Sequence, residues 1–184
     1  MRAFVALEIS SQEALDSIVR LQGELSRTGA DLKTVARENI HFTVKFLGEI
    51  TQGQAREVDE RLRSLRLSRA TVEVRGIGAF PSIGRPNVIW AGVLPAHEER
   101  LRPIAQIAIA ALEGVGEQDR RPFTAHATVA RVRSARGAGG LTAFLRSNTD
   151  RLFGEVDFLE LKLKSSVLGP QGPTYTDIGA YPLI

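Results

Sequence analysis

The sequence predicts an α+β fold in which two similar lobes face each other across a cleft. We expect each lobe to have an antiparallel sheet with helices on its outer side, so that the molecule is pseudo-two-fold symmetric. The order strand–helix–strand–helix–strand occurs twice along the chain and is followed by one further strand. In addition, His41-x-Thr43-Val44 recurs as His126-x-Thr128-Val129, each time on the second strand of its half. No flexible linker separates the halves, so we treat residues 1–184 as a single two-lobed domain.

Two of the predicted helices begin at capping boxes, in which a Ser or Thr and a Glu or Gln three residues later satisfy each other's free backbone N–H groups. Ser10 and Glu13 have this spacing and precede apolar residues at helical intervals from Ala14 to Leu25. Thr51 and Gln54 precede a second stripe of the same kind. Both helices should therefore pack one apolar face against a sheet.

The remaining elements follow from shorter patterns. A third helix is expected from about His97 to Leu112, with Pro103 either in its first turns or marking a later start, and a fourth from Leu141 to about Arg146. Pro and Gly residues at 81–86 and 169–173 predict turns between neighbouring strands. The predicted strands are residues 2–9, 40–47, 71–77, 87–94, 123–133, 156–164 and 175–183.

Composition limits the class of protein. With 43% hydrophobic and 24% charged residues among 184, the chain is expected to be globular. We find no apolar run near the roughly 20 residues that a membrane helix needs, no signal peptide and no cysteine. We therefore expect a cytoplasmic protein without disulfides and without a membrane partner. The net charge of +3 and an excess of Arg favour a polyanionic partner.

The two histidine motifs carry the candidate chemistry. Side chains alternate between the faces of a strand, so His41 and Thr43 share one face while Phe42 faces the core. His126 and Thr128 repeat this arrangement in the second half. If the lobes face each other, one cleft receives two imidazoles and two hydroxyl groups.

This set of groups suits cleavage of a phosphodiester. A neutral imidazole can take a proton from water and an imidazolium can donate one to the leaving oxygen, each transfer contributing about 10²–10⁴ in rate. Two alternatives stay open: histidines that only stabilise the fold, and a zinc site that a distant carboxylate completes. The chain has neither a P-loop nor a metal-binding spacing such as His-Glu-x-x-His, so we expect no metal and no other cofactor.

Longer segments around the histidines resemble a known family. Residues 38–48, 123–131 and, less specifically, 1–9 and 164–175 are similar to the two-histidine phosphoesterase superfamily. Within it they resemble the RNA 2',3'-cyclic phosphodiesterases, also called 2'-5' RNA ligases (LigT-like). The resemblance implies a bilobal fold and hydrolysis of a terminal 2',3'-cyclic phosphate to a 2'-phosphate, with the 3'-oxygen leaving. In some members it also implies reversible, ATP-independent 2'-5' joining of RNA.

The same resemblance assigns roles to individual residues. His41 would donate the proton and His126 would accept one, while Thr43, Thr128 and Arg131 would bind the phosphate. Arg131 lies an odd number of residues after its histidine, so it reaches the cleft only if the strand ends, twists or bulges near residue 130.

Two further side chains of the first motif are assigned by pattern alone. Lys45 shares the parity of His41 and is therefore expected on the cleft side, where it would bind substrate. Phe46 is expected in the core, in preference to stacking a base at the cleft rim.

The sequence thus predicts a monomeric hydrolase whose partners are RNA ends with a 2',3'-cyclic phosphate, with tRNA fragments among the candidates. The alternative function is a non-catalytic RNA-end-binding protein on the same scaffold. Turnover of a nucleoside 2',3'-cyclic phosphate in chelator separates the two.

Overall fold

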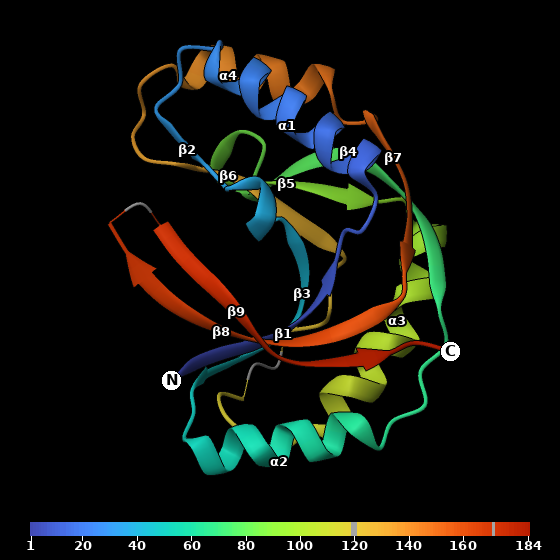
Figure 1. Cartoon of the computed structure of the whole chain (residues 1–184). Coiled ribbons are helices and arrows are strands. Elements are labelled where there is room, and N and C mark those ends of the chain that lie inside the picture. The colour runs from blue at the N-terminus through green and yellow to red at the C-terminus, as the bar shows by residue number, and fades with distance from the viewer. Residues whose placement is uncertain (119–120, 171) are drawn as a thin grey trace.

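A computed structural model describes residues 1–118, 121–170 and 172–184 and confirms the α+β class, with the antiparallel sheet in the middle and the helices outside it (Figure 1). The helices are α1 (Gln12–Ser26), α2 (Gln52–Arg63), α3 (Pro95–Ala111) and α4 (Ala138–Ser147), with one 3-10 turn, η1 (Arg37–Asn39). The strands are β1 (Arg2–Glu8), β2 (Leu32–Thr34), β3 (His41–Glu49), β4 (Ala70–Ser82), β5 (Arg85–Val93), β6 (His126–Val132), β7 (Leu152–Phe158), β8 (Glu160–Gly169) and β9 (Gly172–Pro182).

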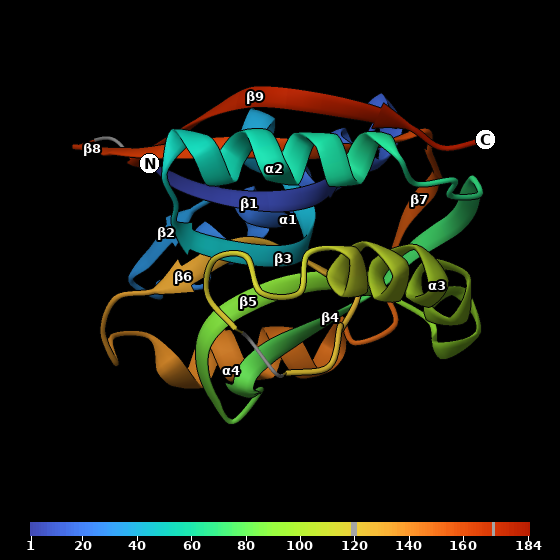
Figure 2. The same cartoon turned by 90° about the horizontal axis from the view of Figure 1, so that it is seen from below.

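The strand order shows the two-fold repeat. The sheet runs β7-β4-β5-β6-β3-β1-β8-β9, and β2 pairs with β6 on the edge opposite β5. Figure 2 shows β9, β1, β3, β6 and β5 following one another across the molecule. At its middle, β3 and β6 pair antiparallel through Phe42 and Ala127, which we call the central pair. These two residues hold the same position in the repeat, so the pseudo-two-fold axis passes between them. The two sheets expected as separate are thus joined at this point into one.

Helices cover the two ends of the molecule. α1 and α4 lie together beyond the half of the sheet that contains β5 and β6, and α2 and α3 lie beyond the other half (Figure 1). Buried aliphatic and aromatic side chains from all four helices and both halves form one contiguous core. Among the described residues, no helix is long and apolar enough to cross a membrane.

The start of α2 agrees with its predicted capping box, whereas the N-cap of α1 lies one residue later than predicted. Thr51 and Gln54 form the predicted box, with bonds of 3.1 Å to the N–H of Gln54 and 2.9 Å to the N–H of Thr51. At α1, however, Ser11 and not Ser10 is the N-cap, and its hydroxyl accepts a hydrogen bond of 3.2 Å from the N–H of Ala14. Two consecutive serines offer two candidate caps, and the Glu13 spacing favoured the wrong one.

Several other elements differ from the prediction. β2 was not predicted, because three residues are too few for a pattern of alternation. The run predicted at 156–164 is two strands, because the pairing changes at the exposed Leu159: β7 pairs with β4, whereas β8 pairs with β1 and β9. α3 begins with Pro95 in its first turn and includes Pro103 in its interior. In the turn predicted at 169–173, β8 and β9 pair as far as Gly169 and Gly172, while Gln171 lies outside the described residues.

Both histidine-bearing strands contain a β-bulge directly after the threonine. On β3, Lys45 pairs with Val5 and Thr43 pairs with Ala6, so Val44 has no partner on β1. Such an extra residue reverses the face to which the next side chains point.

The bulge on β6 occupies the equivalent position. Ala130 pairs with Ile89 and Thr128 pairs with Trp90, which leaves Val129 without a partner on β5. The repeat therefore extends beyond the sequence motif to an irregularity of the backbone. It decides which side chains reach the cleft.

Candidate active site

The fold brings the four motif side chains together. His41, Thr43, His126 and Thr128 all line one cavity of about 500 Å³ between the two halves of the sheet. The reason is the central pair, whose side chains are 0% exposed and point into the core. The residues on either side of that pair must point the opposite way, and the antiparallel direction places each histidine towards the other strand's threonine.

Backbone carbonyl groups orient both imidazoles in the same manner. His41 Nδ1 donates to the carbonyl of Asn39 and His126 Nδ1 donates to that of Thr124, both at 2.7 Å. A carbonyl can only accept, so the neutral form of each ring carries its proton on Nδ1 and leaves Nε2 as the acceptor. His41 Nε2 lies 3.0 Å from Thr43 Oγ1, whereas His126 Nε2 has no hydrogen-bond partner among the described residues.

Aromatic side chains surround both rings. Phe4 stacks on His41 with 4.9 Å between ring centroids, and Tyr175 meets the same imidazole edge-on at 5.5 Å. Phe80 packs edge-on against His126 at 5.0 Å. These contacts fix the ring planes and exclude water from one side of each imidazole.

Desolvation sets the charge of the two histidines. Burial lowers the pKa of His41 to about 4, partly offset by the hydrogen bond to Asn39, which raises it. Burial also lowers the pKa of His126, against the effect of its hydrogen bond to Thr124. In the protein by itself, both imidazoles are therefore neutral at neutral pH.

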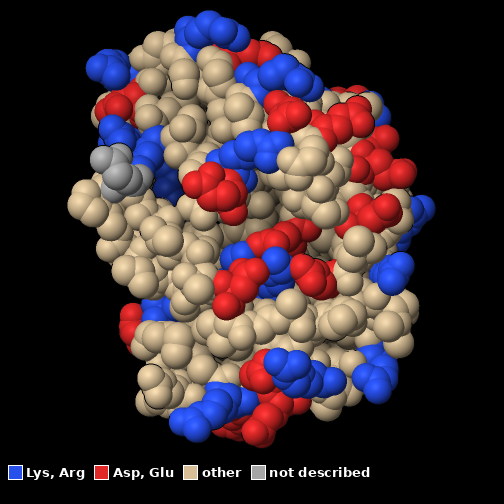
Figure 3. All heavy atoms as spheres, in the orientation of Figure 1, with Lys and Arg blue, Asp and Glu red and all other residues tan. Residues whose placement is uncertain are grey.

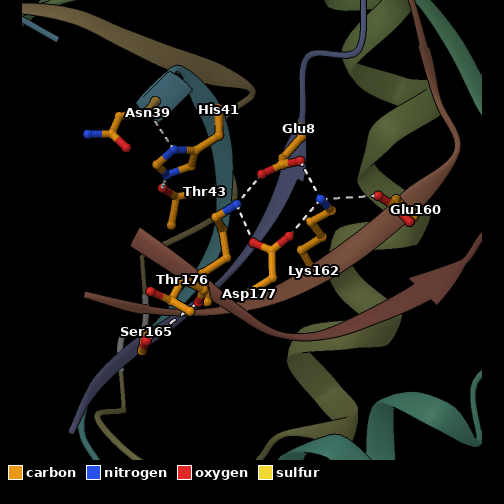
Figure 4. A network of polar contacts seen from close by, with 10 residues as sticks. Glu8, Asn39, His41, Thr43, Glu160, Lys162, Ser165, Thr176 and Asp177 are labelled. Atoms are coloured by element: carbon orange, nitrogen blue, oxygen red, sulfur yellow. Dashed lines mark hydrogen bonds and ion pairs between the residues drawn. The ribbon is translucent and has the colours of Figure 1, made fainter. Parts of the chain in front are cut away.

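An ion-pair network adjoins His41 (Figure 4). Glu8 is the β1 partner of His41 in the sheet register. Lys162 Nζ lies 2.7 Å from Glu8 and 2.8 Å from Asp177, and the buried ammonium of Lys164 contacts Glu8 and lies 2.6 Å from Asp177. Burial raises the pKa of Glu8, but hydrogen bonds from both lysines bring it below its ordinary value.

The network keeps its charges paired within the protein. Acidic and basic side chains likewise lie side by side over the middle of the face in Figure 3. Sequence reasoning missed these residues, because their signal is only a pair of lysines at alternate positions of one strand. Because carboxylates pair with both ammonium groups, Lys162 and Lys164 are not available to bind a substrate.

Comparison with known proteins identifies the family. The protein-family model described as LigT like Phosphoesterase matches residues 7–90, which include the first histidine motif. An Aeropyrum pernix protein named RNA 2',3'-cyclic phosphodiesterase is 39% identical over 159 residues, 86% of this chain and 90% of that one. The chain belongs to the LigT-like phosphoesterases.

Two further relatives span nearly the whole of this LigT-like phosphoesterase. An Archaeoglobus fulgidus protein with the same name is 33% identical over 98% of this chain and 99% of its own. The crystal structure of TT0787 from Thermus thermophilus superposes with a TM-score of 0.76 at 29% identity, and covers 100% of this chain and 98% of that one. The bilobal LigT-like fold expected from the resemblance is thereby confirmed.

The bulge on β6 brings Arg131 to the site. Arg131 lines the cavity although it is five residues from His126, because Val129 is the extra residue that changes the parity. The Val129 carbonyl accepts hydrogen bonds of 2.9 Å from the side chain of Gln22 and 3.0 Å from the N–H of Val35. Gln22 is itself buried, so the bulge is a supported feature of this LigT-like phosphoesterase.

The bulge on β3 has the opposite consequence for Lys45. The prediction that Lys45 faces the cleft is wrong, because Val44 shifts the alternation by one residue. Lys45 is buried beside Val5 and does not line the cavity. The expectation that Phe46 lies in the core is wrong as well, because its side chain is 47% exposed and lines the cavity. Phe46 and Arg131 are equivalent positions of the repeat.

Residues outside the predicted set complete the wall of the cavity. Tyr175 and Pro173 come from β9, and Lys33 comes from β2. Asn39 supports this wall, because its side-chain amide donates to the carbonyl of Pro173 at 2.9 Å while its own carbonyl holds His41. Asn39 lies within residues 38–48 and Tyr175 within residues 164–175, two segments that resemble the family. The resemblance assigned neither residue a role.

Metal ligation has little support in the arrangement of side chains. Over the described ranges, no three His, Asp or Glu residues are grouped so that they could hold a metal ion. The zinc alternative would need a third ligand beside His41 and His126, and among the described residues of the cavity wall only Glu38 has a carboxylate.

The depressed pKa of His41 predicts a specific loss of stability in acid. The unfolded chain takes up this proton near pH 6.5, whereas the folded protein takes it up only near pH 4. Between these values unfolding is favoured as the pH falls, by up to about 3 kcal/mol. Denaturant unfolding of wild type and His41→Gln from pH 7.5 to 4 should show the variant gaining stability relative to wild type. Parallel curves for the two proteins would contradict this pKa.

Proposed function

We propose that this LigT-like phosphoesterase hydrolyses RNA 2',3'-cyclic phosphate ends to 2'-phosphomonoesters by acid–base catalysis with His41 and His126. The observation that carries the proposal is the symmetric pair of imidazoles, each held through Nδ1 with Nε2 left to act in one cavity. The names of the Aeropyrum pernix and Archaeoglobus fulgidus relatives support the same reaction.

The proton transfers follow from this geometry. His126 Nε2 accepts a proton from water as the water oxygen bonds to phosphorus, and His41 Nε2 donates a proton to the 3'-oxygen as the phosphorus–oxygen bond breaks. His126 suits the role of base because its Nε2 has no partner within the described chain, whereas Nε2 of His41 already contacts Thr43. The step leaves His126 protonated and His41 neutral, so His126 must lose a proton to solvent and His41 must regain one before the next turnover.

The substrate itself supplies the charge that the acid requires. A phosphate monoanion between the imidazoles favours the imidazolium form and raises the pKa that burial lowers. Thr43, Thr128 and Arg131 line the cavity beside the histidines and would hold the non-bridging oxygens. The same site would form a 2'-5' linkage if a 5'-hydroxyl took the place of water.

The proposal includes the physical state of the enzyme. Both histidines come from one chain, which supports action as a monomer, and the absence of cysteine from the sequence suits the cytoplasm. RNA fragments, tRNA halves among them, are the proposed substrates. Proton transfer by the two imidazoles requires no metal and no other cofactor.

The proposed function predicts turnover in the presence of a chelator. The protein is expected to convert a nucleoside 2',3'-cyclic phosphate in EDTA to the nucleoside 2'-phosphate alone, because the 3'-oxygen is the one that leaves. Chromatographic separation of the 2' and 3' isomers measures this. Loss of activity in EDTA that a divalent ion restores contradicts the metal-free mechanism. Binding without turnover supports the alternative of an RNA-end-binding protein.

A further inference from the structure

A second hollow opens beside the catalytic cavity at the end of β3. This hollow, the rim pocket, has a volume of about 380 Å³. It is lined by Arg2, Phe46, Glu117, Gln118 and Arg121. Arg2 and Phe46 also line the cavity that contains the histidines, so the two hollows adjoin at these side chains. A chain molecule bound in the cavity can therefore extend into the rim pocket.

Aromatic rings lead from the catalytic histidine to this pocket. Phe4 stacks on His41 at 4.9 Å, and Phe46 lies 6.1 Å beyond Phe4 at a tilt of 45°. Phe46 reaches the rim only because of the bulge at Val44, and it is 47% exposed. An exposed aromatic face beside a polyanion site is suited to stacking a nucleobase.

The polar side chains of the rim pocket suit the other parts of a nucleotide. Arg2 and Arg121 carry the positive charge that a phosphodiester needs, although the Glu117 carboxylate offsets part of it. Glu117 and Gln118 can accept hydrogen bonds from a ribose hydroxyl or a base amino group. The rim pocket thus combines a ring, cations and hydrogen-bonding groups.

The backbone around Glu117 is anchored to β3. The N–H of Glu117 donates to the carbonyl of Leu47 at 2.9 Å. Gly48 has a φ of +66°, and a side chain there would occupy the space of the Glu117 carboxylate. The Glu117 carboxylate therefore lies against Gly48, and it lines the same pocket as Phe46.

We propose that the rim pocket binds the penultimate nucleotide of an RNA strand, the one on the 5' side of the terminal nucleotide that carries the cyclic phosphate. The inference rests on the proposed function, because it takes the cyclic phosphate to lie between His41 and His126. The strand continues from the 5'-oxygen of the terminal nucleotide. The rim pocket adjoins the cavity and has an aromatic ring, cations and hydrogen-bonding groups that can bind the next nucleotide. The preferred substrate is then an oligoribonucleotide and not a cyclic mononucleotide.

The test is a ratio of two activities. For each protein, kcat/KM is measured with a dinucleotide that ends in a 2',3'-cyclic phosphate and with the matching cyclic mononucleotide. Wild type should prefer the dinucleotide. Phe46→Leu should reduce this ratio on the order of 10-fold because it removes a stacked base, and Phe46→Trp should keep it. Arg121→Gln should reduce the ratio as well, most strongly at low salt.

A control variant separates loss of the subsite from a general effect of substitution. Arg20→Gln removes an exposed arginine on α1, outside both hollows, and should leave the ratio unchanged. An unchanged ratio in Phe46→Leu and Arg121→Gln, or equal losses on both substrates, overturns the subsite while the proposed function stands. Inactivity of wild type on both substrates overturns the proposed function and the subsite with it.

Discussion

His126→Ala is expected to lower kcat for a nucleoside 2',3'-cyclic phosphate by about 10²–10⁴, because it removes the proposed base for the attacking water. The fold should survive, since the imidazole is only partly buried and its packing partner Phe80 is itself 38% exposed. Steady-state kinetics measure the first effect and thermal unfolding measures the second. A loss of activity without a comparable loss of stability identifies a chemical role.

His97→Ala is the matched control for this experiment. His97 lies on α3 away from the cavity, and its Nδ1 accepts a hydrogen bond of 2.8 Å from the N–H of Glu73. Its removal should lower stability by about 1 kcal/mol and leave kcat within about twofold. Near-normal turnover by His126→Ala would show that the two-histidine mechanism is wrong.

The site could be predicted to the extent that it follows from regular strand geometry. Alternation of faces places His41 and Thr43 together, and the repeat does the same for His126 and Thr128, as the shared cavity confirms. The same rule fails after the threonines, because a bulge is a property of strand pairing that no single-strand pattern contains. Lys45 was consequently placed on the wrong face.

Arg131 shows how the two kinds of reasoning differ. Strand parity alone opposed it, while the family resemblance favoured it, and the bulge at Val129 reconciles them. The carbonyl of that extra residue is satisfied by Gln22, a polar residue on the inward face of α1. A glutamine among apolar helix positions was the one local signal that the backbone beneath it is irregular.

The sequence predicts the symmetry of the fold but not the joining of its two halves into one sheet. The repeated order of elements gives two equivalent halves, yet the central pair joins them into one sheet. Apolar side chains at these two positions are expected whether the sheets are separate or joined, so the sequence pattern cannot distinguish the cases. Similarly, β2 pairs with β6 over three residues and depends on tertiary contact alone.

Changing the leaving group should separate the roles of the two histidines. If His41 protonates the departing 3'-oxygen, His41→Ala should lose about 10²–10⁴ in kcat on a cyclic phosphate. It should recover much of this loss on an activated aryl phosphodiester, provided that wild type accepts that substrate, because an aryloxide leaves without a proton. His126→Ala should stay impaired on both substrates, since it still lacks a base for water.

The comparison of both variants on both substrates is internally controlled. A general loss of binding or of folded protein lowers both activities of a variant together, whereas loss of the acid lowers only the one that needs a proton. The carbonyl groups of Asn39 and Thr124 hold the two rings equivalently, so neither hydrogen bond to Nδ1 assigns the roles in advance. Selective rescue of His126→Ala would reverse acid and base, and rescue of neither variant would mean that protonation of the leaving oxygen is not the task of either imidazole.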